Sequence, residues 1–445
     1  MNLEGEIEDE GYFWNPETPG TRFLGKLAIT RTGSATLTIS GNIPEHGVGM
    51  FCDNGDLAKY GPVTLLKIFF TGKQGQSFTF SVEEVILGDH ITNIFSPEFF
   101  EARIAIEGLN EWINFPWLTP TVNKRSKFLR VTSKPARPKK HVINDDLLLY
   151  IEQDREANSS DSGNKLTLEQ KTFLRFKWKH PQTIYEIQVI AFRINAFLCL
   201  MLDHPLSITL IEITKSKKAR DRKWAKLIYK SVPDSTSSKI SPLHFLVPYQ
   251  TIESDFAGLF NKYIDLIAEI RIIYDLYFSA SAFNHELLEP KFLLLVQGLE
   301  VYHRISFRGK VLPRNEFSEL KKRLKLACLS PAQIDLIMPK LGYANDFSLR
   351  QRLEELLNDI PNSLPMADKE KMVDRATDTR NYNTHFSRRL KTKACFGTDL
   401  YNLSNQCKAL LFLCILKALG LNTGKIIGIS RSRNIERPAK SDSIV

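Results

Sequence analysis

A change in the spacing of apolar residues near residue 250 constrains the fold of this chain more than any other feature. Before it, short segments such as GKLAIT and SATLTIS alternate apolar and polar residues around a turn at RTGS, which is the period of a half-buried strand. After it, apolar residues recur every three or four positions, beginning with a long helix expected from about Phe256 to Tyr277. We therefore expect an α+β multidomain chain, with a β-rich N-terminal region (an antiparallel sheet or sandwich) and a C-terminal helical bundle.

A chain of 445 residues is long enough for several domains. The periodicity and the local composition divide it into five segments. Residues 1–120 are expected to be an antiparallel β domain. Residues 121–165 are basic and Pro-rich, then polar, and are expected to be a linker or loop. Residues 166–250 mix an apolar helix with strands and are expected to be an α/β continuation of the first domain. Residues 251–430 are expected to form the helical bundle, and residues 431–445 a basic tail.

Several protein classes are disfavoured by simple counts. The N-terminus, MNLEGEIEDE, lacks the basic flank and apolar stretch of an export signal. The longest apolar runs, AFLCLML and ALLFLCIL, are far shorter than the ~20 residues that span a bilayer. The 6 cysteines include no Cys-x-x-Cys pair and no histidine at ligand spacing. We expect a cytoplasmic protein that needs no metal and no cofactor and does not enter a membrane.

Basic clusters indicate a polyanionic partner. The formal charge is +10, from 60 Lys and Arg against 50 Asp and Glu, and clustered cations attract RNA or DNA by releasing its counterions. The alternative is that the clusters are solvated loops. The candidate RNA contacts are Lys139, Lys140, Lys217, Lys218, Arg220 and Arg222.

The segment TRNYNTHF, residues 379–386, carries the strongest catalytic candidates. His385 could move a proton at a ribose 2′-OH or a leaving 5′-oxygen, because histidine titrates near neutral pH. Arg380 could stabilise the charge on the phosphate, and Asn381 could orient either side chain. No carboxylate cluster accompanies them, so no metal is required, and metal-free chemistry at a 2′-OH implies RNA.

Helix geometry limits how these residues can act together. On an ideal helix Asn381 and His385 lie on one face, whereas Arg380 and His385 diverge by roughly 140°. Both can reach one phosphate only if Arg380 lies at a helix end or if two copies of the motif face each other. The pattern alone is short, and a polar face of a surface helix remains the alternative.

Three segments together resemble a known family. They are the helix KFLLLVQGLEVYHR (291–304), the motif RNYNTH (380–385), and the N-terminal segments EGYFWNPE and GKLAIT…TLTISG. They resemble the ApeA-like subgroup of HEPN proteins, which act in prokaryotic anti-phage defence. The resemblance implies a metal-independent endoribonuclease that works as a homodimer or higher homo-oligomer. It also implies abortive infection as the outcome, with an N-terminal region that senses a phage-derived trigger or restrains the nuclease.

The resemblance assigns residues as well as a function. Arg380 and His385 match the catalytic pair, and Asn381 matches its polar neighbour. Glu300, Tyr302 and His303 lie in the second signature helix and are expected to make structural hydrogen bonds within the bundle. Tyr382 and Phe386 could be core anchors or base-stacking residues, and we expect core anchors. The alternative function is a non-catalytic HEPN module that dimerises and binds nucleotide or RNA.

Overall fold

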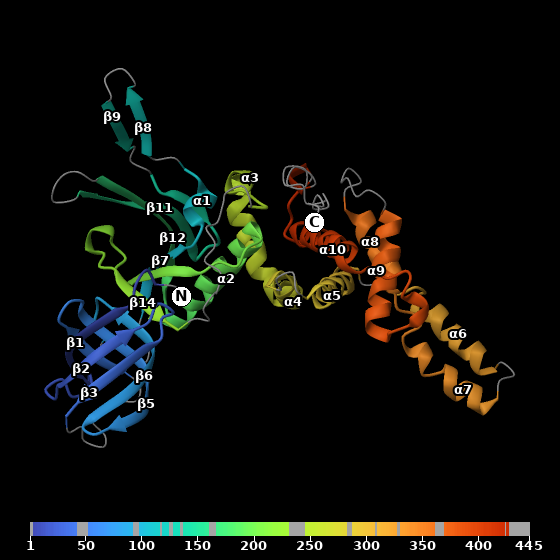
Figure 1. Cartoon of the computed structure of the whole chain (residues 1–445), viewed down its shortest axis with the longest axis horizontal. Coiled ribbons are helices and arrows are strands. Elements are labelled where there is room, and N and C mark those ends of the chain that lie inside the picture. Colours follow the sequence, from blue (N-terminus) through green and yellow to red (C-terminus); the bar gives the residue numbers. More distant parts are fainter. Residues whose placement is uncertain are drawn as a thin grey trace. The chain divides into compact units, whose positions relative to one another are not determined.

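The chain has the α+β architecture expected from its sequence, and Figure 1 shows this computed structural model. The described residues are 3–41, 52–91, 98–115, 118–123, 128–133, 137–159, 166–230, 245–282, 287–307, 309–326, 330–360, 369–422 and 424–426. The chain divides into two compact units, Met1–Asn261 and Lys262–Val445. The functional domain boundaries expected above stay predictions.

The first unit begins with a closed antiparallel barrel. Its strands are β1 (Ile7–Trp14), β2 (Phe23–Ile29), β3 (Ala35–Ser40), β4 (Cys52–Leu57), β5 (Gly61–Gln74) and β6 (Ser77–Leu87). They follow the order β6-β3-β2-β1-β4-β5, and β5 pairs back with β6. The interior is filled by alternate residues such as Phe13, which is 1% exposed. A Cβ at Gly55 would lie 2.6 Å from the Phe13 ring, so only glycine fits beside it.

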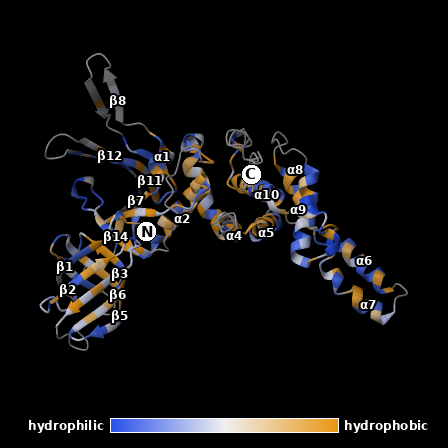
Figure 2. Ribbon diagram, in the orientation of Figure 1, coloured by the Kyte–Doolittle hydropathy of each residue, from blue (hydrophilic) through white to orange (hydrophobic). Residues whose placement is uncertain are grey.

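Strand β6 links this barrel to an open sheet. Its residues 77–82 pair with β3, and its residues 84–87 pair along the same edge with β14 (Ala225–Tyr229). From β14 the sheet continues through β13 (Ile208–Thr214), β7 (Phe99–Ile106), β12 (Leu166–Gln182), β11 (Leu147–Ser159) and β10 (Lys139–Val142). A separate hairpin joins β8 (Leu118–Asn123) to β9 (Phe128–Ser133). Figure 2 shows apolar and polar residues alternating along the strands.

The prediction of a linker or loop at residues 121–165 is wrong for most of the residues of this segment that the structure describes. Strands β8, β9, β10 and β11 lie within or overlap this segment, and β11 pairs with β12 over its whole length. The polar composition that favoured a loop reflects exposure, because β11 alternates inward apolar residues such as Leu149 and Ile151 with outward, exposed Asp154 and Glu156. A strand with one solvated face looks polar on average.

Helix α2 (Ile184–Leu202) packs on β7 in the open sheet. A capping box between Thr183 and Glu186 begins it, and Asp203 ends it in a left-handed conformation. Among the described helices it alone is long and apolar enough to cross a membrane, but 61% of its apolar window is buried, as in the core helix of a globular unit. Two further helices, α1 (Leu109–Ile113) and α3 (Tyr249–Ile252), complete the first unit.

Helix α4 (Phe256–Ala282) begins in the first unit and continues into the second. The second unit then contains α5 (Leu288–Ser306), α6 (Arg314–Leu326), α7 (Pro331–Ile337), α8 (Leu349–Asp359), α9 (Lys369–His385) and α10 (Gly397–Ala418). Short 3-10 turns lie at Ala219–Asp221, Glu253–Asp255, Lys340–Gly342 and Arg388–Leu390. Helices α5 and α10 approach closely, because a Cβ at Gly298 would lie only 2.7 Å from Leu411.

Candidate active site

The motif predicted from the sequence lies entirely on α9 (Lys369–His385). One face of this helix is buried through Met372, Val373, Ala376 and Thr379, which recur at helical spacing and anchor it in the bundle. The helix begins 11 residues before Arg380, at Lys369. It continues through Arg380 and Asn381 to His385, and these residues occupy its last turns.

Arg380 is held by two neighbours. Its Nη2 lies 3.3 Å from Oε1 of Glu300 on α5, and its Nη1 donates to Oδ1 of Asn381 at 3.3 Å. The side chain is 31% exposed and that of Glu300 is 18% exposed. The guanidinium is therefore oriented from one side while part of it remains open to solvent. Glu300 makes a structural hydrogen bond within the bundle, as expected, but no sequence signal identified Arg380, 80 positions away, as its partner.

His385 is the last residue of α9 and is exposed. No side-chain hydrogen bond or ion pair joins it to another residue within the described ranges. Because Arg380 and His385 belong to one continuous helix, their side chains leave it in directions that diverge by roughly 140°. Arg380 lies five residues before the end of α9 and not at the helix end itself. Of the two arrangements that could bring both side chains to one phosphate, only the one with two facing copies of the motif therefore remains.

His303, three residues after Glu300 on α5, belongs to a buried chain of polar contacts. Its side chain is 0% exposed; Nε2 lies 2.5 Å from Oε2 of Glu355, and Nη1 of Arg352 lies 2.9 Å from Nδ1. A guanidinium can only donate, so Nδ1 accepts and Nε2–H donates to the carboxylate. This fixes the neutral tautomer. Burial is the main reason that the pKa of His303 is lowered, and the Arg352 charge adds to it, although the hydrogen bond to Glu355 acts in the opposite direction.

The other residues of this region have mixed outcomes. His303 makes the structural hydrogen bonds that were expected, and Tyr302 is buried, which raises the pKa of its hydroxyl. Tyr382 is half-buried. Phe386 is not a core anchor, because 74% of it is exposed. The prediction failed since Phe386 lies one residue beyond the helix, where the apolar periodicity no longer indicates burial.

The candidate RNA contacts of the first unit are not one surface. Lys140, Lys217, Lys218 and Arg220 are exposed, whereas Lys139 pairs with Glu253. Strand β10, which carries Lys139 and Lys140, is four strands away from β13, a separation of about 19 Å at the usual strand spacing. The cluster at residues 217–222 follows β13.

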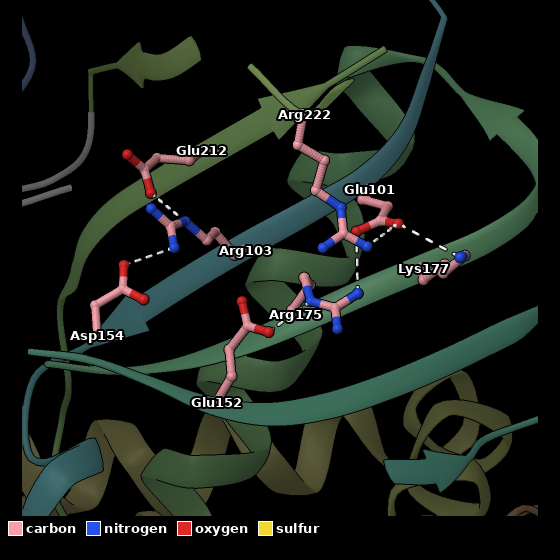
Figure 3. Close-up of polar contacts among 8 residues, drawn as sticks. All are labelled: Glu101, Arg103, Glu152, Asp154, Arg175, Lys177, Glu212 and Arg222. Carbon is pink, nitrogen blue, oxygen red and sulfur yellow. Dashed lines mark hydrogen bonds and ion pairs between the residues drawn. The ribbon is translucent and has the colours of Figure 1, made fainter. Parts of the chain in front are cut away.

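Arg222 has an internal partner instead of solvent. Its Nη2 lies 2.9 Å from the fully buried Glu101, which also pairs with Arg175 at 3.0 Å and Lys177 at 3.6 Å. Figure 3 shows these residues in a layer on one face of the sheet, together with Arg103, Glu152, Asp154 and Glu212. The layer holds four basic and four acidic side chains, so it is electrically balanced and gives Arg222 a structural role.

The described residues contain no group of three or more His, Cys, Asp or Glu side chains that could hold a metal ion.

Two family models match the chain. The ApeA N-terminal domain 1 matches residues 8–263, and the Apea-like HEPN domain matches residues 293–425. The first alone covers more than half of the chain. The chain belongs to the ApeA family. Its C-terminal HEPN domain contains α5, α8, α9 and α10, and domains of the HEPN family are generally ribonucleases that bind RNA and dimerise. No curated protein and no solved structure matches the ApeA-family chain.

Proposed function

We propose that this chain is a metal-independent RNA endonuclease that protects a cell population from phage by abortive infection. The observation that carries the proposal is the pair Arg380 and His385 on one helix of an Apea-like HEPN domain. Arg380 is partly open and oriented by Glu300, and His385 is exposed at the helix end. Each of the two side chains is therefore accessible to a phosphodiester from solvent.

In the proposed reaction a histidine and an arginine act on one RNA phosphate. The imidazole of His385 takes the proton of a ribose 2′-OH, and the 2′-oxygen attacks the adjacent phosphorus. The bond from phosphorus to the 5′-oxygen breaks, and that oxygen receives a proton. The products are a 2′,3′-cyclic phosphate and a 5′-OH end. Arg380 donates to the phosphate oxygens as negative charge builds on them.

The proposed site is composite. Since the two side chains diverge on one helix, two copies of α9 must face each other so that each copy supplies a histidine to the same scissile phosphate. One histidine then acts as the base and the other as the acid. This arrangement accounts for both proton transfers without a metal.

Cleavage of end-labelled RNA in EDTA tests the proposal. We expect the wild type to leave 2′,3′-cyclic phosphate ends and His385→Ala to lose at least roughly 100-fold in rate, the usual lower range for a general acid or base. His180→Ala is a matched control, because His180 is also exposed but lies in the first unit. Equal cleavage by wild type and His385→Ala would refute the assignment.

One observation favours the alternative of a non-catalytic binding module. Arg380 already has a carboxylate partner in Glu300, which lowers its availability to a phosphate. If RNA binds in EDTA with no cleavage, even during phage infection, a binding module replaces the nuclease as the function.

We also propose that the first unit senses a phage-derived trigger or restrains the nuclease, and that the protein acts in the cytoplasm. Residues 251–445 would then be the effector part. Cells that express the full chain and cells that express residues 251–445 should differ in growth. Equal, harmless growth with a stable dimer of the shorter chain would count against restraint.

A further inference from the structure

The connection between α9 and α10, residues 386–396, has features that the proposed catalytic pair does not explain. It begins with Phe386 directly after His385 and ends with Phe396 before α10. These two rings are 74% and 44% exposed. Large apolar rings are normally buried, and two of them exposed beside a candidate active site need a reason.

The two rings belong to one aromatic cluster. Tyr382, one helical turn before Phe386, has its ring centroid 5.7 Å from that of Phe386 and 5.5 Å from that of Phe396. Tyr382 is half-buried and contacts both exposed rings. Most of Phe386 and nearly half of Phe396 are exposed to solvent beside Tyr382.

The backbone holds Phe386 in a costly conformation. Its φ is +48°, and its N–H donates to the carbonyl oxygen of Tyr382 at 2.8 Å, which closes α9. Glycine or asparagine usually occupies such a left-handed helix end, and a bulky residue there is unusual. An exposed ring in this position recovers little of that cost by burial. Strained positions of this kind cluster at functional sites.

A cationic turn lies between the two aromatic residues. Four basic side chains, Arg388, Arg389, Lys391 and Lys393, are exposed. No acidic side chain of the described residues forms an ion pair with any of them. Two hydrogen bonds hold the end of this connection against α9. The N–H of Cys395 donates to Oγ1 of the buried Thr379 at 3.0 Å, and Nε of Arg375 donates to Sγ of Cys395 at 3.0 Å. The turn therefore presents uncompensated positive charge from a fixed base.

We propose that Phe386 and Phe396 form a stacking surface for unpaired bases of the RNA substrate, and that the turn at residues 388–393 binds the flanking phosphates. Exposed aromatic rings beside a positive groove are the usual means of holding a single strand, because every base has a face to stack and every linkage has a charge. Bases in a duplex are stacked on each other and unavailable to such rings. The surface thus selects single-stranded RNA and places it next to His385. This inference rests on the proposed ribonuclease function.

The test measures binding separately from cleavage. The full chain carrying His385→Ala is titrated into a labelled single-stranded oligonucleotide of uridines, a duplex of the same length, and an abasic strand with the same phosphates. Phe386→Gly in this background removes the ring while also relieving the left-handed strain, so the variant folds. Phe386→Trp keeps an aromatic ring. Tyr185→Ala is the matched control, because Tyr185 is 73% exposed but lies in the first unit.

We expect Phe386→Gly to weaken single-strand binding by roughly 5- to 150-fold, the range for losing one stacked base. Phe386→Trp and Tyr185→Ala should bind as the parent does, and the abasic strand should not distinguish Phe386→Gly from the parent. Arg388→Ala with Arg389→Ala should reduce the slope of log affinity against log salt by about 0.7 for each phosphate that these arginines no longer neutralise.

Any one of three results would refute the proposed stacking surface. They are equal affinity of Phe386→Gly and its parent for the single strand, tighter binding of duplex than of single strand, and no binding of the single strand at all. Cleavage by the wild type decides the proposed function independently. If the wild type cleaves RNA without metal and Phe386→Gly binds single strands normally, the proposed stacking surface is refuted and the proposed ribonuclease function stands. If affinity depends on the Phe386 ring but the wild type does not cleave RNA, the stacking surface is supported and the ribonuclease function is refuted.

Discussion

Acid should destabilise the HEPN domain through His303. Folding holds this side chain neutral between the donor of Arg352 and the acceptor Glu355, so the pKa of His303 is lowered from its ordinary value of 6.5, mainly by burial. As the pH falls below 6.5, the unfolded chain binds a proton that the folded chain does not, and the free energy of unfolding therefore decreases. Because a single site is involved, the slope can reach at most about 1.4 kcal/mol per pH unit.

His303→Gln isolates this effect. A glutamine amide can accept from Arg352 and donate to Glu355 at every pH, so the variant keeps the polarity of the chain of hydrogen bonds but cannot titrate. The difference in unfolding free energy between wild type and variant should shrink steadily from about pH 7.5 to about pH 5.

The assay must report on the second unit alone. All 5 tryptophans lie before residue 225, in the first unit, so their fluorescence does not follow the bundle. Amide hydrogen exchange of α5 and α8, corrected for intrinsic rates at each pH, gives the local unfolding free energy. A difference that stays constant across this pH range would refute the neutral tautomer. A wild type that gains stability in acid would show that the Glu355 charge dominates.

Two further predictions concern carboxylates that pair with basic side chains. Glu300→Gln should lower RNA cleavage by roughly 10- to 100-fold, because Arg380 loses its orienting carboxylate; RNA affinity should not fall, because Glu300 competes with the phosphate for Arg380, and unchanged cleavage would contradict the role of Glu300. Glu101→Gln should destabilise the first unit by about 3–5 kcal/mol, since Arg175, Lys177 and Arg222 lose a fully buried counter-charge. Tryptophan fluorescence in urea measures the latter, Lys218→Ala is its exposed control, and equal midpoints for wild type and Glu101→Gln would refute it.

The sequence indicated the elements that have a strong local signal. The period of two before residue 120 and the period of three to four after Phe256 predicted the fold class correctly, because alternation and helical spacing decide which side chains face a core. The composition of residues 121–165 misled the prediction. Strand β11 has a solvated face, and its pairing with β12 is a contact between distant residues that composition does not report.

The same division holds for the candidate site. The sequence by itself determined which catalytic groups are present, an arginine and a histidine five positions apart, since residue identity and spacing in 380–385 do not depend on folding. Only the tertiary structure decided that the motif lies inside a helix, that Glu300 orients Arg380, and that Phe386 is exposed. The physical reason is that ion pairs between helices and the exposure of a ring depend on how segments 80 residues apart pack, and packing is set by the whole bundle and not by local spacing.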